Sequence, residues 1–138
     1  MPAIVQHHAT PPHLRLLLTG MVSPEELSTA AAQLLDAVRD HHVPHVITDA
    51  RDLAGGHGTL DLYGLCAWLS SNPVARTIRE AVLLPRAAAM TDDVRFWETA
   101  CLNHGLQVKA FGEMEDAMQW LFAIPARAPG TTAEGLAS

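Results

Sequence analysis

The sequence is poor in lysine and in positive charge, and each shortage excludes a class of function. Lys109 is its only lysine, so chemistry that needs a lysine amine has a single candidate, which lies in a predicted strand. Nine basic residues against fifteen acidic ones give a net charge of −6, the wrong sign for binding nucleic acid through its phosphates. We therefore expect no nucleic-acid partner.

Cysteines and long apolar runs are also scarce. Cys66 and Cys101 are the only cysteines and lie far apart, which excludes a CxxC redox or zinc motif and a disulfide framework. No stretch approaches the roughly 18 apolar residues of a membrane span, and residues 1–13 lack the regions of a signal peptide. The sequence predicts a cytoplasmic protein with no membrane span.

What is present suits one globular domain. Hydrophobic residues make up 49% of the chain and charged residues 17%, a balance that favours a packed core over disorder. Periodic patterns end near residue 122, and the small residues and prolines that follow lack any period. We predict one domain over residues 1–122 and a disordered tail over 123–138.

The first third of the chain carries clear start and stop signals. Residues 3–8 and 14–19 resemble strands, and Pro11 and Pro12 between them predict a turn and hence a hairpin. Ser23 precedes a proline and stands three residues before Glu26, which is the pattern of a capping box. A helix should follow and run to about residue 40.

The remainder alternates between strand and helix patterns. Residues 45–48 predict a buried strand that ends at Asp49, and the glycines of residues 50–59 predict a mobile loop. Further elements are expected as helices over 59–69, 91–104 and 113–122 and as strands over 81–84 and 106–111. The order predicts an α/β fold: an N-terminal hairpin in a mixed, mostly parallel sheet of about five strands, covered by about four helices.

Several segments together resemble the small SpoIIAA-like proteins of the STAS superfamily. They are GMVSPEEL at 20–27, the strand ending in Asp49, VRFWE at 94–98, GLQVKAF at 105–111 and EDAMQWL at 115–121, within residues 14–121. The resemblance implies the fold named above and a non-enzymatic switch protein with a protein partner. In the anti-sigma-factor antagonists of this superfamily, a partner kinase phosphorylates a Ser or Thr at the start of the helix that follows the central strand. Here the Asp-Ser-x-Gly-Leu signature is missing, and Thr59 is the only hydroxyl near that position.

Thr59 has a plainer interpretation as the N-cap of the helix it precedes. Threonine suits that position, whereas Asp61 nearby would oppose the charge of a phosphate. The glycine-rich loop before it lacks the GxxxxGK[ST] pattern, so a P-loop is excluded. We keep Thr59 as a candidate phosphoacceptor or helix cap.

The loop after the central strand holds the best candidates for a ligand or partner site. Histidine is suited to acid–base chemistry near neutral pH, and Asp49, Arg51 and Asp52 are close to His57 in sequence. No nucleophile stands beside them, whereas loops at the carboxyl ends of parallel strands commonly bind ligands. Binding is favoured over catalysis, and a merely solvated loop over both.

The eight histidines are the oddest feature of the composition. They cluster as His7, His8 and His13 and again around Pro44, at spacings that can suit zinc or nickel. No closed set of ligands can be named, so surface or helix-capping roles are favoured. The sequence therefore predicts neither a metal site nor a cofactor.

The helix expected over residues 59–69 is apolar nearly all round. One buried face does not need so many apolar residues, so we expect it to lie over an apolar cavity or in a homodimer interface, with Tyr63 as a contact residue. Trp68, Trp97 and Trp120 are expected to pack against the sheet.

Three functions are compatible with these features of the sequence. The first is a STAS-like regulatory or protein-interaction module that uses residues 50–59 and the helix after them. The second is a carrier or sensor of a small apolar, lipid-like ligand held between that helix and the sheet. The third is an enzyme built around His57 and the nearby carboxylates, which requires a concave site that contains them.

Overall fold

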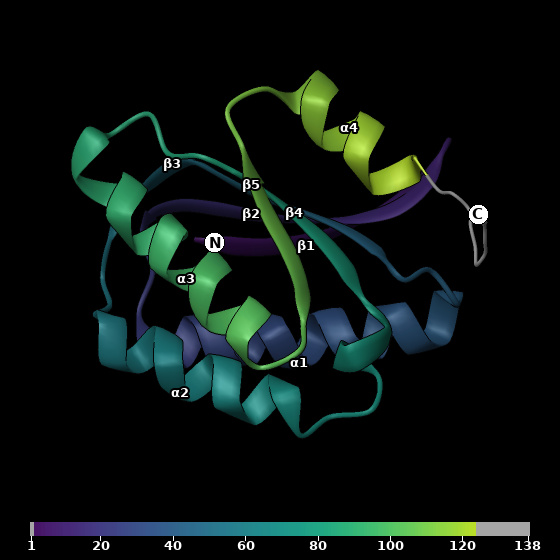
Figure 1. Cartoon of the computed structure of the whole chain (residues 1–138), viewed down its shortest axis with the longest axis horizontal. Coiled ribbons are helices and arrows are strands. Elements are labelled where there is room, and N and C mark those ends of the chain that lie inside the picture. Colours follow the sequence, from purple (N-terminus) through teal and green to yellow (C-terminus); the bar gives the residue numbers. More distant parts are fainter. Residues whose placement is uncertain (1, 124–138) are drawn as a thin grey trace.

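The fold is built on one mixed sheet, as the sequence predicts. The structure is a computed structural model that describes residues 2–123 (Figure 1). Within them, five strands lie side by side in chain order: β1 (Ala3–Ala9), β2 (Pro12–Met21), β3 (His45–Gly55), β4 (Arg79–Leu83) and β5 (Gln107–Phe111). The pair β1–β2 is the antiparallel hairpin and the other pairs are parallel. This confirms the predicted α/β class.

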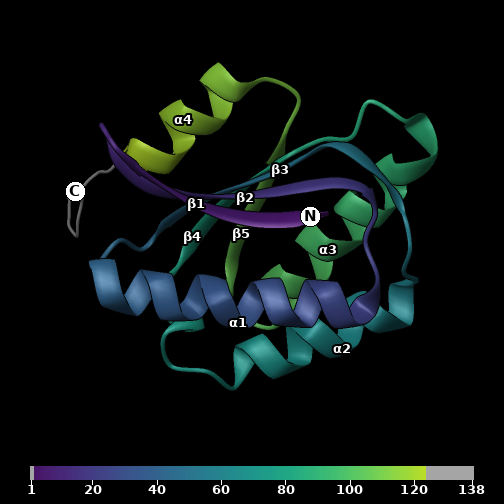
Figure 2. The same cartoon turned by 180° about the vertical axis from the view of Figure 1, so that it is seen from behind.

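Helices cover both faces of the sheet, unequally. On one face lie α1 (Pro24–His41), α2 (Thr59–Ser70) and α3 (Thr91–Asn103), and on the other lies α4 (Met114–Phe122). Figures 1 and 2 show α4 across the sheet from α1 and α2. Two short 3₁₀ helices, η1 (Ala75–Thr77) and η2 (Ala88–Met90), flank β4. Side chains alternate along each strand, so neighbouring residues face different helix layers.

The start of α1 forms as its sequence predicts. The Glu26 N–H donates to Ser23 Oγ at 3.1 Å, and the Ser23 N–H donates to Glu26 Oε1 at 2.9 Å. These two bonds satisfy N–H groups that a helix start leaves unpaired. The capping box is confirmed.

The expected loop over residues 50–59 is wrong over its first half. Strand β3 continues to Gly55, because the end of β2 runs beside it and pairs Thr19, Gly20 and Met21 with residues 52, 53 and 55. Ala50 and Leu53 are buried as a result. Glycines in the segment suggested a turn, but a partner strand supplied the hydrogen bonds that extended backbone needs.

A tight loop then leads from β3 into α2. Gly56 has a φ of +105°, and a Cβ at that position would stand 2.5 Å from the carbonyl oxygen of Val22. Only glycine fits this approach. Gly58, not Thr59, occupies the N-cap of α2, and its N–H donates to Asp61 Oδ2 at 2.8 Å. The prediction that Thr59 caps the helix is therefore wrong by one residue.

The tryptophans differ from one another in burial. Trp97 and Trp120 are partly buried and pack against core clusters, as predicted. Trp68 is 46% exposed, so its predicted packing against the sheet is wrong. Its helix places it on the outer side, toward a groove shared with α1.

Two further predictions meet the structure only in part. Among residues 2–123, no helix is both long enough and apolar enough to cross a membrane. The predicted tail over 123–138 lies, beyond residue 123, outside the described residues.

Candidate functional site

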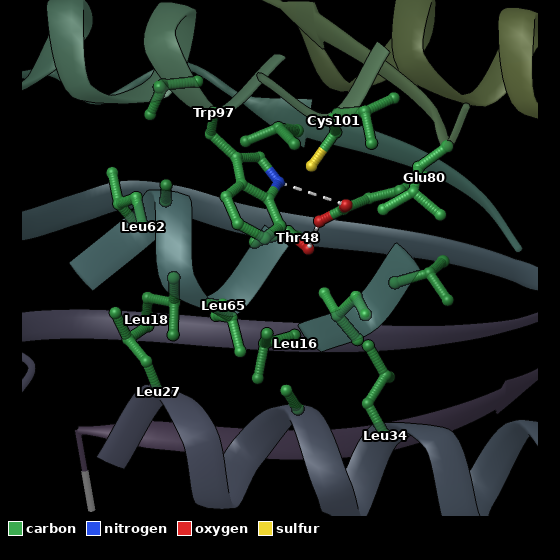
Figure 3. A pocket seen from close by; sticks show the side chains of 18 of the residues that line it. Leu16, Leu18, Leu27, Leu34, Thr48, Leu62, Leu65, Glu80, Trp97 and Cys101 are labelled. Atoms are coloured by element: carbon green, nitrogen blue, oxygen red, sulfur yellow. Dashed lines mark hydrogen bonds between the residues drawn. The ribbon is translucent and has the colours of Figure 1, made fainter. Parts of the chain in front are cut away.

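A cavity of about 110 Å³, partly open to solvent, lies between the sheet and the layer of α1, α2 and α3. Its lining is mostly leucine, valine and alanine from all of these elements (Figure 3). Leu62 and Leu65 reach it from α2, and Leu16 and Leu18 reach it from β2. The apolar circumference of α2 predicted an apolar cavity or a homodimer interface, and this cavity matches the first alternative.

Helix α2 lies over this cavity and reaches the core through its side chains. Its backbone lies against α3, η1 and α1, with at most slight contact to any strand. Of its side chains only Leu62 and Cys66 are fully buried, whereas Leu65 and Leu69 are partly buried against the core. Helix α2 therefore covers the cavity while its backbone contacts mainly the neighbouring helical segments α1, α3 and η1.

Three polar side chains meet at one end of this apolar space. Glu80 of β4 receives a hydrogen bond at Oε1 from Trp97 Nε1 of α3 at 3.3 Å. The Thr48 hydroxyl of β3 donates to the other carboxyl oxygen. Figure 3 shows the indole turned toward the carboxyl group. Glu80 is partly exposed and lines the cavity.

Burial dominates the electrostatics of this end. It raises the pKa of the Glu80 carboxyl, and the hydrogen bonds from Thr48 and Trp97 offset only part of that rise. None of the ion pairs found within residues 2–123 includes Glu80. A buried carboxyl group without a cation favours its protonated form.

The two cysteines lie in the same layer and are fully buried. Burial raises the pKa of the Cys66 thiol, and burial together with the nearby Glu80 raises that of Cys101 much further. Since the thiolate is the reactive form of cysteine, neither side chain is prepared for nucleophilic chemistry. Cys101 contributes instead to the wall of the cavity.

His57 is the predicted site residue that does line the cavity. Its ring is 2% exposed, and its Nδ1 stands 2.9 Å from the carbonyl oxygen of Val22. A carbonyl only accepts, so Nδ1 carries a proton. The other ring nitrogen, Nε2, is 3.8 Å from Asp93 Oδ2 of α3.

The other members of the predicted constellation lie elsewhere. Asp49 follows Ile47 on the face of the sheet that carries α4, and Arg51 donates to it from Nε at 3.0 Å and from Nη2 at 2.9 Å. These bonds from Arg51 lower the pKa of the Asp49 carboxyl. Asp52 pairs with Arg86 at the surface. The carboxylates thus do not join His57, and the concave site that the enzyme hypothesis requires does not contain them.

Thr59 and Tyr63 face outward from α2. Thr59 is exposed, and Tyr63 is 50% exposed with its ring centre 5.4 Å from that of His104. Neither lines the cavity, so they belong to the outer surface of the helix.

The histidines of the sequence clusters are divided between stacked pairs: His8 stacks on His13 at 4.9 Å between ring centres. His13 is buried, and burial lowers its pKa, while His7 stacks on His41 at 4.2 Å. In the part of the chain that the structure describes, no three metal-ligating side chains converge on one point.

Sequence reasoning missed the polar end of the cavity. The strand predicted over residues 81–84 does not include Glu80, whereas the observed strand β4 does. An acid directly before an apolar strand was the available signal. Thr48 and Trp97 lie on the elements predicted for them. The register of β3 with β4 brings Thr48 near Glu80, and the position of α3 brings Trp97 to it.

Comparisons with known proteins agree on the fold. No family model matches the chain, and no curated protein is significantly similar to it in sequence. A solved protein of the DUF3478 family from Shewanella loihica PV-4, uncharacterised and with a SpoIIAA-like fold, is 17% identical, with a TM-score of 0.57 over 86% of this chain and 91% of that one. The unphosphorylated anti-sigma factor antagonist SpoIIAA is 16% identical, with a TM-score of 0.57 over 88% and 99%. The chain therefore has a SpoIIAA-like fold.

Proposed function

We propose that this SpoIIAA-like domain is a non-enzymatic binding module that holds a small apolar molecule in the cavity beneath α2. The observation that carries the proposal is the cavity itself, a space of about 110 Å³ with a largely apolar lining. Protein interiors are normally packed to the density of organic crystals, and an internal void destabilises the fold. A cavity of the same order, roughly 150 Å³, is known to stay dry and bind benzene or xenon.

The lining and its cover both suit such a ligand. A ligand that fills the cavity would give dispersion contacts to leucine side chains of α1, α2, β2 and β3, which line it. The weak attachment of α2 to the sheet offers a route of entry that needs no unfolding of the strands. His57, in the loop between β3 and α2, and Asp93 of α3 also line this space. A bound ligand would therefore be in reach of both side chains.

Titration with toluene followed by backbone amide NMR tests this function. Toluene should shift the amide signals of residues around the cavity and leave those of α4 unchanged. Ala50→Leu, which places three carbons into the cavity wall, should abolish the shifts. Ala89→Leu, the same change at an exposed position, should preserve them. Absence of cavity shifts, or equal shifts in Ala50→Leu, would contradict the proposal.

The exposed face of α2 supports a second function, a STAS-like regulatory module that acts through a protein partner. Leu60 is 86% exposed and Trp68 46% exposed, and both line a groove of about 460 Å³ between α1 and α2. Apolar side chains grouped around a groove are typical of interaction surfaces. The simplest partner is a second copy of this chain, which would bury the two faces against each other.

Sedimentation equilibrium distinguishes this surface from other exposed apolar residues. Leu60→Glu and Trp68→Glu should weaken self-association, whereas Leu102→Glu, at a position 54% exposed on α3, should not. Thr59→Asp places a charge at the start of the same helix and should also weaken it, while Thr59→Ala should not. A monomer at all concentrations would exclude the homodimer, and identical behaviour of the two Thr59 variants would exclude a phosphoswitch.

A further inference from the structure

We propose that the molecule held in the cavity carries one uncharged hydroxyl group, and that Glu80 recognises this group and determines the specificity of the site. The inference rests on the proposed cavity function and names the chemistry of its ligand. It starts from the position of Glu80, whose carboxyl group lies at one end of a largely apolar space that β3, β4 and α3 help to line.

The hydrogen bonds of Glu80 leave capacity for a ligand. The Trp97 N–H uses one acceptor site on Oε1, and the Thr48 hydroxyl uses one on Oε2. A carboxyl group has about four acceptor sites when ionised, and one donor with the remaining acceptors when protonated. At least one further bond is therefore available on the side that faces the cavity. The same two bonds from Thr48 and Trp97 hold the group in place before any ligand arrives.

The surroundings of Glu80 select an uncharged partner. The lining of the space is mostly leucine, valine and alanine, with His57 and Asp93 also present, and no cation pairs with Glu80 among the described residues. A ligand carboxylate would add a further acid to a lining that already holds Glu80 and Asp93, which burial strongly disfavours. A protonated carboxyl group both donates and accepts, and a hydroxyl group does the same. A carbonyl or ether oxygen can only accept, so it would match half of what Glu80 offers.

The size of the cavity limits the rest of the ligand. About 110 Å³ accommodates roughly one ring or a short branched chain, judged against the 150 Å³ space that binds benzene. A phenol or a small branched alcohol is thus the ligand class that fits both the lining and the carboxyl group. A longer apolar chain would require α2 to move outward.

Phenol and toluene form a matched pair for the test, because they have the same number of heavy atoms and differ in a hydroxyl against a methyl group. A purely apolar cavity would favour toluene, since burying an unpaired hydroxyl is costly. We expect wild-type protein to bind phenol at least as tightly as toluene, with both dissociation constants measured by NMR titration. In Glu80→Met the preference should move toward toluene by about tenfold or more. Glu80→Gln, which still donates and accepts, should keep most of the preference for phenol.

Each result supports or contradicts a separate statement. If wild-type protein binds toluene at least tenfold more tightly than phenol, or if Glu80→Met leaves the ratio unchanged, the hydroxyl inference is wrong and the apolar cavity function stands. If neither compound binds, both fall. If Glu80→Met does not fold, the wild-type ratio alone decides.

Discussion

At the scale of single residues, Glu80 is where the demands of folding and of binding conflict. A carboxyl group on a strand between two others costs free energy to bury, and an apolar residue of similar size would pack without that cost. The fold reduces the cost with hydrogen bonds from Thr48 and Trp97. Stability alone does not account for a carboxyl group at this position. The Glu80 carboxyl group lines the cavity, and its proposed role in ligand binding does account for it.

The raised pKa of Glu80 predicts how its contribution to stability depends on pH. The unfolded chain ionises this group above its ordinary pKa of about 4.3, while the folded chain retains the proton to higher pH because burial raises the pKa. The folded state then binds more protons than the unfolded state, so stability falls as pH rises through this window. Glu80→Gln removes the titration and should therefore raise the free energy of unfolding more at pH 7 than at pH 4.

Urea unfolding of the wild type and of Glu80→Gln at both pH values measures this difference. Other titrating groups cancel because the two proteins are compared at each pH. A gain from Glu80→Gln that is the same at pH 4 and pH 7 would show that the group ionises alike in both states.

At the scale of elements, α1 and α2 have different kinds of stability. Helix α1 begins with a side-chain capping box and buries six residues along one side. Helix α2 begins at a glycine without a side chain to cap it, buries two residues and carries Gly64 in its middle. Its apolar residues on the outer side gain nothing from the sheet. The cover of the cavity is therefore the weaker of the two helices.

A pair of glycine-to-alanine substitutions should show where this weakness can be repaired. Nothing lies within 4 Å of a Cβ placed at Gly64, so Gly64→Ala should stabilise the protein by about 0.5–1 kcal/mol through helix propensity. At Gly56, positive φ and the nearby Val22 backbone make the same change destabilising. Thermal unfolding followed by circular dichroism gives both signs, and a loss of stability in Gly64→Ala would contradict this account of α2.

At the scale of the whole molecule, the two faces of the sheet have different roles. On one face, Leu121 of α4 packs with Ile47 of β3 and Leu83 of β4 in one cluster, and all three side chains are completely buried. On the other face three helices enclose a core that includes the cavity. Figures 1 and 2 show the two layers on opposite sides of the sheet; the cavity lies on the side of the layer of α1, α2 and α3.

Ligand binding should therefore raise the stability of the entire domain. A compound that binds only the folded state adds RT ln(1 + [L]/Kd) to the free energy of unfolding, about 2.7 kcal/mol at one hundred times Kd. Toluene and phenol should raise the melting temperature of the wild type in a concentration-dependent way, and should not raise that of Ala50→Leu. Equal increases in both proteins would place the binding site outside the cavity.

The sequence by itself determined the elements whose signals are local. The hairpin prolines, the capping box at Ser23 and the alternation in residues 106–111 each act over a few neighbours, and the fold class followed from their order. The apolar circumference of α2 also predicted that the helix covers an apolar cavity or forms a dimer interface. Periodicity carries this information because burial repeats with the geometry of a helix or strand.

Tertiary structure alone decided the rest, because it depends on contacts between distant segments. Strand β3 runs to Gly55 only because β2 lies beside it, so a glycine-rich loop in the sequence became a strand. Parallel register brought Thr48 to Glu80, and the position of α3 added Trp97. Pairing across strands also separated Asp49 and Arg51 from His57, which sequence proximity had joined. The sequence thus determined which elements form, and packing between them decided which side chains share the cavity.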